Sequence, residues 1–265
     1  MFTEMEVKSE VIPVSLVIIA RNEAGNLPRC LESVQGWVQE IIVVINDCTD
    51  NTREIAESFH ARVIEHTWEG YSAQKNFAYQ QAQCEWILKL DADEVVSYEL
   101  KTSILRFIKS KQATSCVVAT CRKINRYLNH WMWHTARNRN IALLVKKGAV
   151  TWEGDVHEKL VYQGKTCHLS GDLWHYTETS VQQTFLKQIH YAQLASKTIV
   201  KKYSKTQLIL KAILDPLGNF LQKYVLQCGF LDGFAGFYYS VSNAFYSFCK
   251  YLFAYEKKMR TNQSK

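Results

Sequence analysis

The sequence predicts an α/β fold with a mostly parallel sheet flanked by helices, followed by a C-terminal helical extension. Three observations lead to this prediction. Short apolar runs alternate with segments of helical periodicity as far as Lys109, polar clusters follow the apolar runs, and the composition changes sharply after residue 179. Strands that alternate with helices at this spacing are typical of βαβ units, whose strands run parallel.

Four short apolar segments are predicted to form the parallel strands. They are VSLVIIA (14–20), EIIVVI (40–45), RVIEH (62–66) and WILKL (86–90). The first run is continuous, rich in β-branched residues and too short for an amphipathic helix, which is typical of a strand buried on both faces. Helices are expected between and after these strands, over residues 27–34, 51–59, 71–83 and 98–109.

The next part of the chain is mixed. Strands are predicted at 115–122, 141–145 and 173–176, and the helical pattern resumes at Ser180. For the helix over 51–59, Thr49 or Asp50 is well placed as the N-cap, because a short side-chain oxygen there can accept a hydrogen bond from a free helical N–H.

Three polar loops, 21–26, 46–51 and 91–94, each follow a predicted strand. The carboxyl ends of parallel strands meet at one edge of the sheet, so these loops should converge on a ligand site there. The last loop carries Asp91, Asp93 and Glu94 directly after an apolar strand. Carboxylates this close repel one another, so a positive partner is expected, and a divalent cation is the favoured one. The alternative is that the acids only cap the next helix, because the start of a helix favours negative charge.

Two classes of nucleotide-binding protein are disfavoured. The sequence has no GxGxxG after the first strand and no GxxxxGK[ST]. A dinucleotide oxidoreductase or a P-loop enzyme would need one of these phosphate-binding loops. A nucleotide would therefore have to be held in another way, through a metal on its diphosphate.

Several segments, in this order and at these spacings, resemble family-2 glycosyltransferases, which have the GT-A fold. They are VSLVIIARNEAGNLPRCLESV, EIIVVINDCTDNT and GYSAQKNFAYQQAQCEWILKLDADE. Two later segments, GDVHEKL (154–160) and GFLDGFAGFYYS (229–240), look like the bacterial lipopolysaccharide-core branch, whose members resemble β-1,4-glucosyltransferases acting on the inner-core heptose. The resemblance spans nearly the whole chain.

The resemblance implies a Mg²⁺ or Mn²⁺ ion that neutralises the diphosphate leaving group. Asp93 would be its direct ligand, with Asp91 on the metal or the ribose, and Glu94 would orient them or face the acceptor. His175 could complete the metal shell, although a hydrogen-bonded core histidine is an equally good account.

The resemblance also implies the donor site. Arg21, Asn22, Glu23 and Asp47 would line the nucleoside pocket, and Lys75 would approach the donor. A solvated helix lysine is an equally good account of Lys75. UDP-hexose is the favoured donor, although the acid that holds the base in the family is replaced by Ile45 on an ungapped alignment, followed by Asn46 and Asp47.

An inverting transfer needs a general base for the acceptor hydroxyl. The resemblance favours Glu158, with Asp155 as the alternative and His157 as an orienting residue. A charged, solvent-facing turn is the competing interpretation. Arg137 and Arg139 are candidates for contacts with acceptor phosphates, and a solvated loop accounts for them nearly as well.

The C-terminal segment differs from the rest in charge. Residues 1–179 have a net charge of −2, whereas residues 180–265 hold 12 Lys+Arg against 3 Asp+Glu, a net charge of +9. Phe and Tyr make up 13 of the 36 residues from Phe220 to Tyr255. Aromatic and basic side chains together suit an anionic membrane surface. A helix over 234–254 would lie on that surface, pack as core, or do both. No nucleic-acid-binding motif is present, so no nucleic-acid partner is expected.

The cysteines and the N-terminus favour a cytoplasmic setting. The eight cysteines include no CxxC pair, so reduced thiols are expected. The start, MFTEMEVKSE, is acidic and polar, unlike a signal peptide.

The prediction is an inverting, metal-dependent transferase of a hexose, with glucose favoured. Residues 1–179 would form the catalytic GT-A domain and residues 180–265 a membrane-associating extension. The acceptor would be a lipid-linked saccharide such as lipopolysaccharide inner core, at the cytoplasmic face of the bacterial inner membrane. A sugar nucleotidyltransferase and a non-catalytic scaffold derived from a glycosyltransferase are the alternatives.

Overall fold

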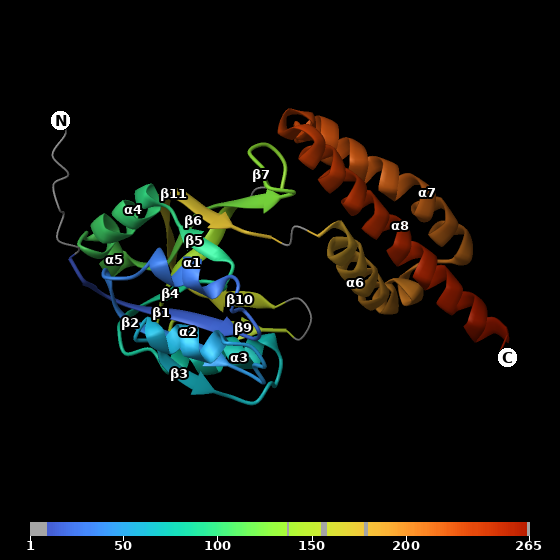
Figure 1. Cartoon of the computed structure of the whole chain (residues 1–265). Helices are drawn as coiled ribbons and strands as arrows, with labels where there is room; N and C mark the ends of the chain where they lie inside the picture. The colour runs from blue at the N-terminus through green and yellow to red at the C-terminus, as the bar shows by residue number, and fades with distance from the viewer. Residues whose placement is uncertain (1–9, 137, 155–157, 178–179, 264–265) are drawn as a thin grey trace. The chain divides into compact units, whose positions relative to one another are not determined.

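The computed structural model describes residues 10–136, 138–154, 158–177 and 180–263 (Figure 1). The chain forms two compact units. The sheet unit comprises residues 1–123 and 138–175, and the helical unit comprises residues 124–137 and 176–265. The helical unit thus takes in a segment from the middle of the chain as well as the predicted extension.

One mixed sheet dominates the sheet unit. Its strand order is β3-β2-β1-β4-β8-β6-β11-β5. The bounds are β1 (Ile12–Ala20), β2 (Val38–Ile45), β3 (Arg62–Glu65), β4 (Trp86–Lys89), β5 (Glu94–Val96), β6 (Cys116–Tyr127), β8 (Asn138–Lys146) and β11 (Lys165–His175). A short strand, β7 (His130–Trp131), pairs with β6, and β9 (Val150–Glu153) with β10 (Lys159–Tyr162) forms a separate antiparallel pair.

The predicted parallel strands are confirmed. Strand β1 runs parallel to both β2 and β4, and β2 runs parallel to β3. Strand β8 pairs antiparallel with β4 and β6, and β5 pairs antiparallel with β11. The predicted helices are present as α1 (Leu27–Glu32), α2 (Thr52–Ser58), α3 (Tyr71–Gln80) and α4 (Tyr98–Ile108), with a short α5 (Gln112–Ser115) after them.

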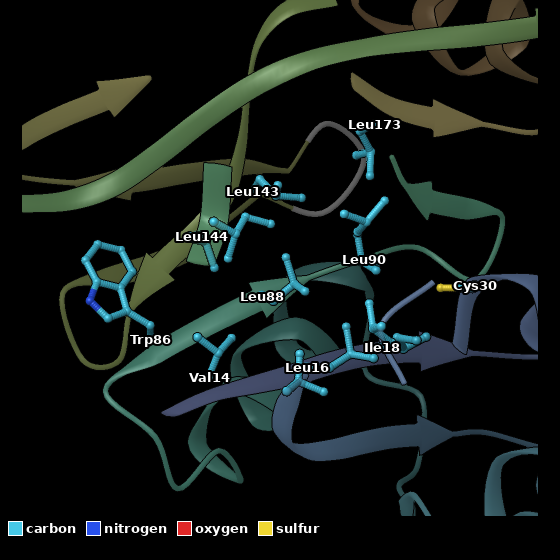
Figure 2. Packing of buried hydrophobic residues seen from close by; sticks show 14 of the residues in the cluster. Val14, Leu16, Ile18, Cys30, Trp86, Leu88, Leu90, Leu143, Leu144 and Leu173 are labelled. Atoms are coloured by element: carbon cyan, nitrogen blue, oxygen red, sulfur yellow. The ribbon is translucent and has the colours of Figure 1, made fainter. Parts of the chain in front are cut away.

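The core lies on both faces of β1, as its continuous apolar sequence predicts. Val14, Leu16 and Ile18 belong to one cluster and Val17 to the other. Successive side chains of a strand point to opposite faces, so a strand covered on both faces is apolar throughout. Figure 2 shows the first cluster, in which Trp86 and other side chains of neighbouring strands pack beside β1. Burial of each such side chain stabilises the fold by about 1.5–3 kcal/mol.

The prediction that all cysteines are reduced is wrong for one pair. Cys116 and Cys167 form a disulfide, with their Cα atoms 6.0 Å apart. The pairing follows from the topology, because β6 and β11 are neighbours in the sheet although 51 residues separate the two cysteines. The other six cysteines are free thiols.

The helical unit is built from α6 (Val181–Lys202), α7 (Lys205–Leu221), the π-helical turn η1 (Gln222–Leu226), the 3₁₀ turn η2 (Gly229–Asp232) and α8 (Gly233–Gln263). Helices α7 and α8 run side by side in Figure 1. The Phe185 ring of α6 packs edge-on against Tyr238 and Phe245 of α8. The aromatic stripe predicted for residues 234–254 therefore serves partly as core.

Asp232 ties the mid-chain segment to these helices. Its buried carboxylate accepts hydrogen bonds from the backbone N–H groups of Trp133, His134 and Thr135. A carboxylate can be buried at low cost when several donors replace its hydration. Within the described ranges, no helix is both long enough and apolar enough to cross a membrane.

Candidate active site

The first two polar loops meet at the carboxyl ends of β1 and β2, as predicted. The side-chain Oδ1 of Asn22 accepts a hydrogen bond from the Thr49 backbone N–H at 2.7 Å. The backbone N–H of Glu23 donates to Thr52 Oγ1 at 2.8 Å. Asn22 can reach across because its backbone is left-handed, with φ +56°, which asparagine tolerates better than most residues.

Asp50 has a different role from the predicted one. Helix α2 begins at Thr52, and its N-cap is Asn51, which makes no side-chain capping bond. Asp50 instead accepts from the backbone N–H groups of Ala24, in the other loop, and Thr52. These hydrogen bonds lower the pKa of Asp50, the bond from the Thr52 side chain most of all. Asp50 is therefore a link between the two loops.

The end of β2 presents a residue that the sequence interpretation did not select. Ile45 is buried in the core, and Asp47 is exposed with φ +44°. Between them, Asn46 is buried, and its Oδ1 atom has no hydrogen-bond partner among the described residues. A buried amide oxygen without a donor costs about 1–3 kcal/mol. Its position, directly after β2 and at the start of the second polar loop, was the signal available in the sequence.

Glu94 stabilises the acidic loop from within the protein interior. Its side chain is completely buried, with Lys123 Nζ 2.7 Å from Oε1. Its other oxygen accepts from the Asp91 backbone N–H at 2.9 Å. Of the two roles considered for Glu94, orienting its neighbours fits these contacts, and a role facing the acceptor does not. Part of the positive charge expected near the acids therefore comes from a lysine.

Asp93 and His175 lie together. The carboxylate Oδ2 of Asp93 is 3.1 Å from His175 Nε2. The antiparallel pairing of β5 with β11 causes this, because it sets His175 opposite Glu94, the residue after Asp93. Both side chains are partly exposed, at 29% for Asp93 and 20% for His175. A ligand could therefore reach both.

The electrostatics of the site link all three loops. Burial raises the pKa of Asp91, but Lys89, Lys123 and Lys75 together lower it below its ordinary value. Burial also raises the pKa of Glu23, and the nearby charges of Asp93, Asp50 and Asp91 raise it further. Glu23 therefore lies close enough to the acidic loop to sense its charge. Arg21, at the same edge, is exposed.

The residues present fit a divalent cation. Mg²⁺ is usually bound by one or two protein carboxylates together with substrate phosphate oxygens, rather than by a complete protein cage. Asp93 and His175 supply two adjacent ligand atoms, and Asp91 and Glu23 add negative charge nearby. No group of three or more His, Cys, Asp or Glu side chains suited to a metal occurs within the described part of the chain.

Lys75 and Glu158 form an ion pair. Lys75 Nζ, on α3, is 2.7 Å from Glu158 Oε1 and lies over the Trp152 ring, 4.2 Å from its centroid. Burial raises the pKa of Glu158, but the hydrogen bond from Lys75 and its charge lower it to a net value below the ordinary one. The solvated-lysine interpretation of Lys75 does not fit this contact. Trp152 was not selected from the sequence.

Four candidates cannot be placed. Asp155 and His157 lie outside the described residues, as does Arg137. Arg139 lies in β8, but its side chain is not among those described.

Comparison with known proteins decides the family. The model of Glycosyl transferase family 2 matches residues 15–174, which is more than half of the chain. The chain belongs to this family. The match covers the three polar loops and ends at residue 174, one residue before His175 at the end of β11. The α/β fold, with its mixed sheet and C-terminal helices, is GT-A-like.

Relatives of this family-2 glycosyltransferase cover most of its length. An uncharacterized glycosyltransferase of Rickettsia typhi is 31% identical over 248 residues, covering 89% of this chain and 85% of the relative. The lipopolysaccharide core biosynthesis glycosyltransferase LpsC of Rhizobium meliloti is 28% identical, covering 89% and 90%. The crystal structure of S. aureus TarS 1–349 in complex with UDP has a TM-score of 0.44 and 14% identity, covering 96% and 92%.

Proposed function

We propose that this glycosyltransferase is an inverting, metal-dependent enzyme that transfers a hexose, with glucose favoured, from a nucleotide sugar to a lipid-linked saccharide. The observation that carries the proposal is the contact between Asp93 and His175 at the edge of the sheet where the polar loops converge. A carboxylate and an imidazole in contact, with further acids nearby, suit a cation that a nucleoside diphosphate also binds.

The donor would be held between the loops and the acids. Asp93 and His175 would bind Mg²⁺ or Mn²⁺, with Asp91 on the metal or the ribose. When bound, the ion supplies Lewis-acid neutralisation of the diphosphate charge that develops as the donor bond breaks. Arg21, Asn22, Glu23 and Asp47 would line the nucleoside pocket, and the unpartnered Asn46 oxygen is a further polar group at the same strand end.

Glu158 would act as the general base. The acceptor oxygen forms a bond to the anomeric carbon, the bond from that carbon to the diphosphate oxygen breaks, and the hydroxyl proton passes to Glu158. Attack from the side opposite the leaving group inverts the anomeric centre. In the free enzyme the hydrogen bond and charge of Lys75 lower the pKa of Glu158, and a diphosphate nearby would compete for the same ammonium group. Asp155 is the alternative base, with His157 orienting.

The acceptor proposal rests on similarity and charge. The relative LpsC is named for lipopolysaccharide core biosynthesis, and the likeness favours an inner-core saccharide. The net charge of +9 over residues 180–265 favours an anionic membrane surface as the place where a lipid-linked acceptor is met. We place catalysis in residues 1–179 and membrane contact in residues 180–265, at the cytoplasmic face of the inner membrane.

The test is calorimetric titration of UDP, GDP and CMP into the purified full chain, with and without Mn²⁺. We expect Mn²⁺-dependent binding of one nucleotide, with UDP favoured. Binding of UDP would also show that the protein holds the uracil ring without an acidic residue at position 45, where this chain has Ile45. Absence of binding for all three nucleotides under both conditions would reject the donor site and support the non-catalytic scaffold.

A further inference from the structure

Helix α7 exposes its apolar side. Six large aliphatic side chains along it are between 47% and 61% exposed: Ile209, Leu210, Ile213, Leu214, Leu217 and Leu221. They recur at spacings of three and four residues, so they share one face of the helix. A surface helix of a soluble protein normally turns such a face toward the core.

The polar side of α7 faces the neighbouring helix. Lys211 and Asp215 form an ion pair at 3.5 Å, and the hydroxyl of Tyr251 on α8 donates to Asp215. Lys211 also lies over the Tyr251 ring, 5.7 Å from its centroid. Leu208 is the only large aliphatic residue of α7 that is fully buried, and it packs with Tyr251 and Ala254. The orientation of α7 is therefore fixed by specific contacts with its apolar face outward.

The exposed apolar surface continues beyond α7. Val225, Leu226, Phe230, Leu231 and Phe234 are all 48% or more exposed. Ring contacts connect this part, since Tyr224 packs edge-on against Phe230 and Phe237. We call the exposed residues of α7 together with these five the apolar ridge. Helix α7 alone is about 25 Å long, so the ridge is far larger than isolated surface hydrophobics.

We infer that the apolar ridge inserts into the interfacial region of an anionic lipid bilayer, with α7 lying along the membrane plane. The inference rests on the proposed function, because a lipid-linked acceptor requires the enzyme to work at a membrane. An apolar face of this length, on a basic helical unit, has the composition of an interfacial helix.

Charge selects lipid over a second copy of the chain. The segment 180–265 has a net charge of +9, and two of its three acids have partners within the unit: Asp215 is paired with Lys211, and Asp232 is buried and hydrogen-bonded. Two such surfaces would repel each other when brought together, whereas each basic residue near an anionic membrane contributes about 1 kcal/mol of attraction.

The inference shifts most of the membrane contact from the helix that the sequence favoured to α7, since Phe234 is the one ridge residue that lies in α8. In the predicted segment 234–254, Tyr238, Cys249 and Tyr251 are buried. Its exposed side chains include Phe248 and Leu252, at 42% and 45%. Substitutions in α7 and in α8 can therefore distinguish the contributions of the two helices to membrane binding.

The experiment is flotation of the full chain with vesicles of phosphatidylcholine, with and without phosphatidylglycerol. Ile213→Glu with Leu217→Glu should lower the partition coefficient on anionic vesicles at least tenfold. Ile209→Ser with Leu214→Ser, which adds no charge, should lower it in the same direction. Gln222→Glu adds a charge to the same stretch without removing an apolar group, and Tyr98→Glu changes an exposed residue of the sheet unit. Both controls should change binding less than twofold.

Three results would overturn the inference. They are wild-type vesicle binding by both α7 variants, loss of binding by Leu252→Glu in place of the α7 variants, or a wild-type dimer in light scattering that Ile213→Glu dissociates. Mn²⁺-dependent nucleotide binding by the same variants checks that they are folded. It also separates the two proposals, because a failed donor site leaves vesicle binding unchanged and a failed ridge leaves nucleotide binding unchanged.

Discussion

Lys75 Nζ lies 2.7 Å from Glu158 Oε1, which connects α3 to a residue 83 positions away, just before β10. The pair is only partly exposed, at 16% for Lys75 and 23% for Glu158, so the charges interact more strongly than they would at an open surface. It connects a group proposed to approach the donor with the proposed base for the acceptor. Two predictions follow from this contact.

Glu158→Gln should abolish most transfer while leaving donor binding intact. The amide cannot accept the acceptor proton, so kcat should fall about 10²- to 10⁴-fold, the usual contribution of a general base. The affinity for UDP with Mn²⁺, measured by calorimetry, should not fall, since the substitution removes no proposed nucleotide contact and releases Lys75 from its ion pair. Glu153→Gln, at an exposed site nearby, is the matched control. Transfer at the wild-type rate would move the base to Asp155.

Lys75→Met should move the acid limb of the pH profile to higher pH. In the wild type, Lys75 holds the pKa of Glu158 below 4.5, so kcat/KM should not fall until the pH drops below that value. Without the lysine, two of the influences that lower this pKa are lost while burial, the largest influence, still raises it, so the pKa should be higher than in the wild type. Lys159→Met, at the exposed neighbour of Glu158, should leave the limb in place. An unshifted limb in Lys75→Met would show that another group controls it.

Asp93→Ala should remove the metal dependence of donor binding. Calorimetric binding of UDP with Mn²⁺ should fall to the level measured without metal, because a direct ligand is lost. The fold should persist, since Asp93 contributes a partly exposed pair worth no more than about 1 kcal/mol. Glu85→Ala removes an acid that is 70% exposed and serves as the control. Unchanged Mn²⁺-dependent binding would exclude Asp93 as a ligand.

Lys123→Met should destabilise the sheet unit. It leaves the completely buried Glu94 carboxylate without its cation, which costs about 3–5 kcal/mol. Urea denaturation should show a lower midpoint for the single variant. The double variant Lys123→Met with Glu94→Gln should recover part of the loss, because no buried charge then remains. A single variant as stable as the wild type would mean that Glu94 is neutral in the folded protein.

The sheet was predictable because its signals are local. The apolar runs at 14–20, 40–45 and 86–90 each lie in a strand, and polar residues directly after the strand ends form the loops. Asp91, Asp93 and Glu94 follow the run at 86–90, and the carboxyl ends of parallel strands carry ligand sites, so these acids could be assigned to a site from the sequence. Strands such as β5, only three residues long, carry no period that a sequence pattern can reveal.

Contacts between distant segments were not predictable in the same way. The disulfide between Cys116 and Cys167 depends on β6 and β11 being neighbours. The N-cap predicted at Thr49 or Asp50 was wrong, and Asp50 also accepts a hydrogen bond from Ala24 in the other loop. In both cases a partner far along the chain decides what the residue does.

The sequence by itself determined the α/β core, the converging loops and the basic, aromatic C-terminal segment. Periodicity and composition are properties of neighbouring residues, so they survive without knowledge of the fold. Only the tertiary structure decided that Lys123 neutralises Glu94, that Lys75 meets Glu158, and that α7 turns its leucines outward. A helix's amphipathic pattern fixes which residues share a face, and only packing against α8 fixes which face is left exposed.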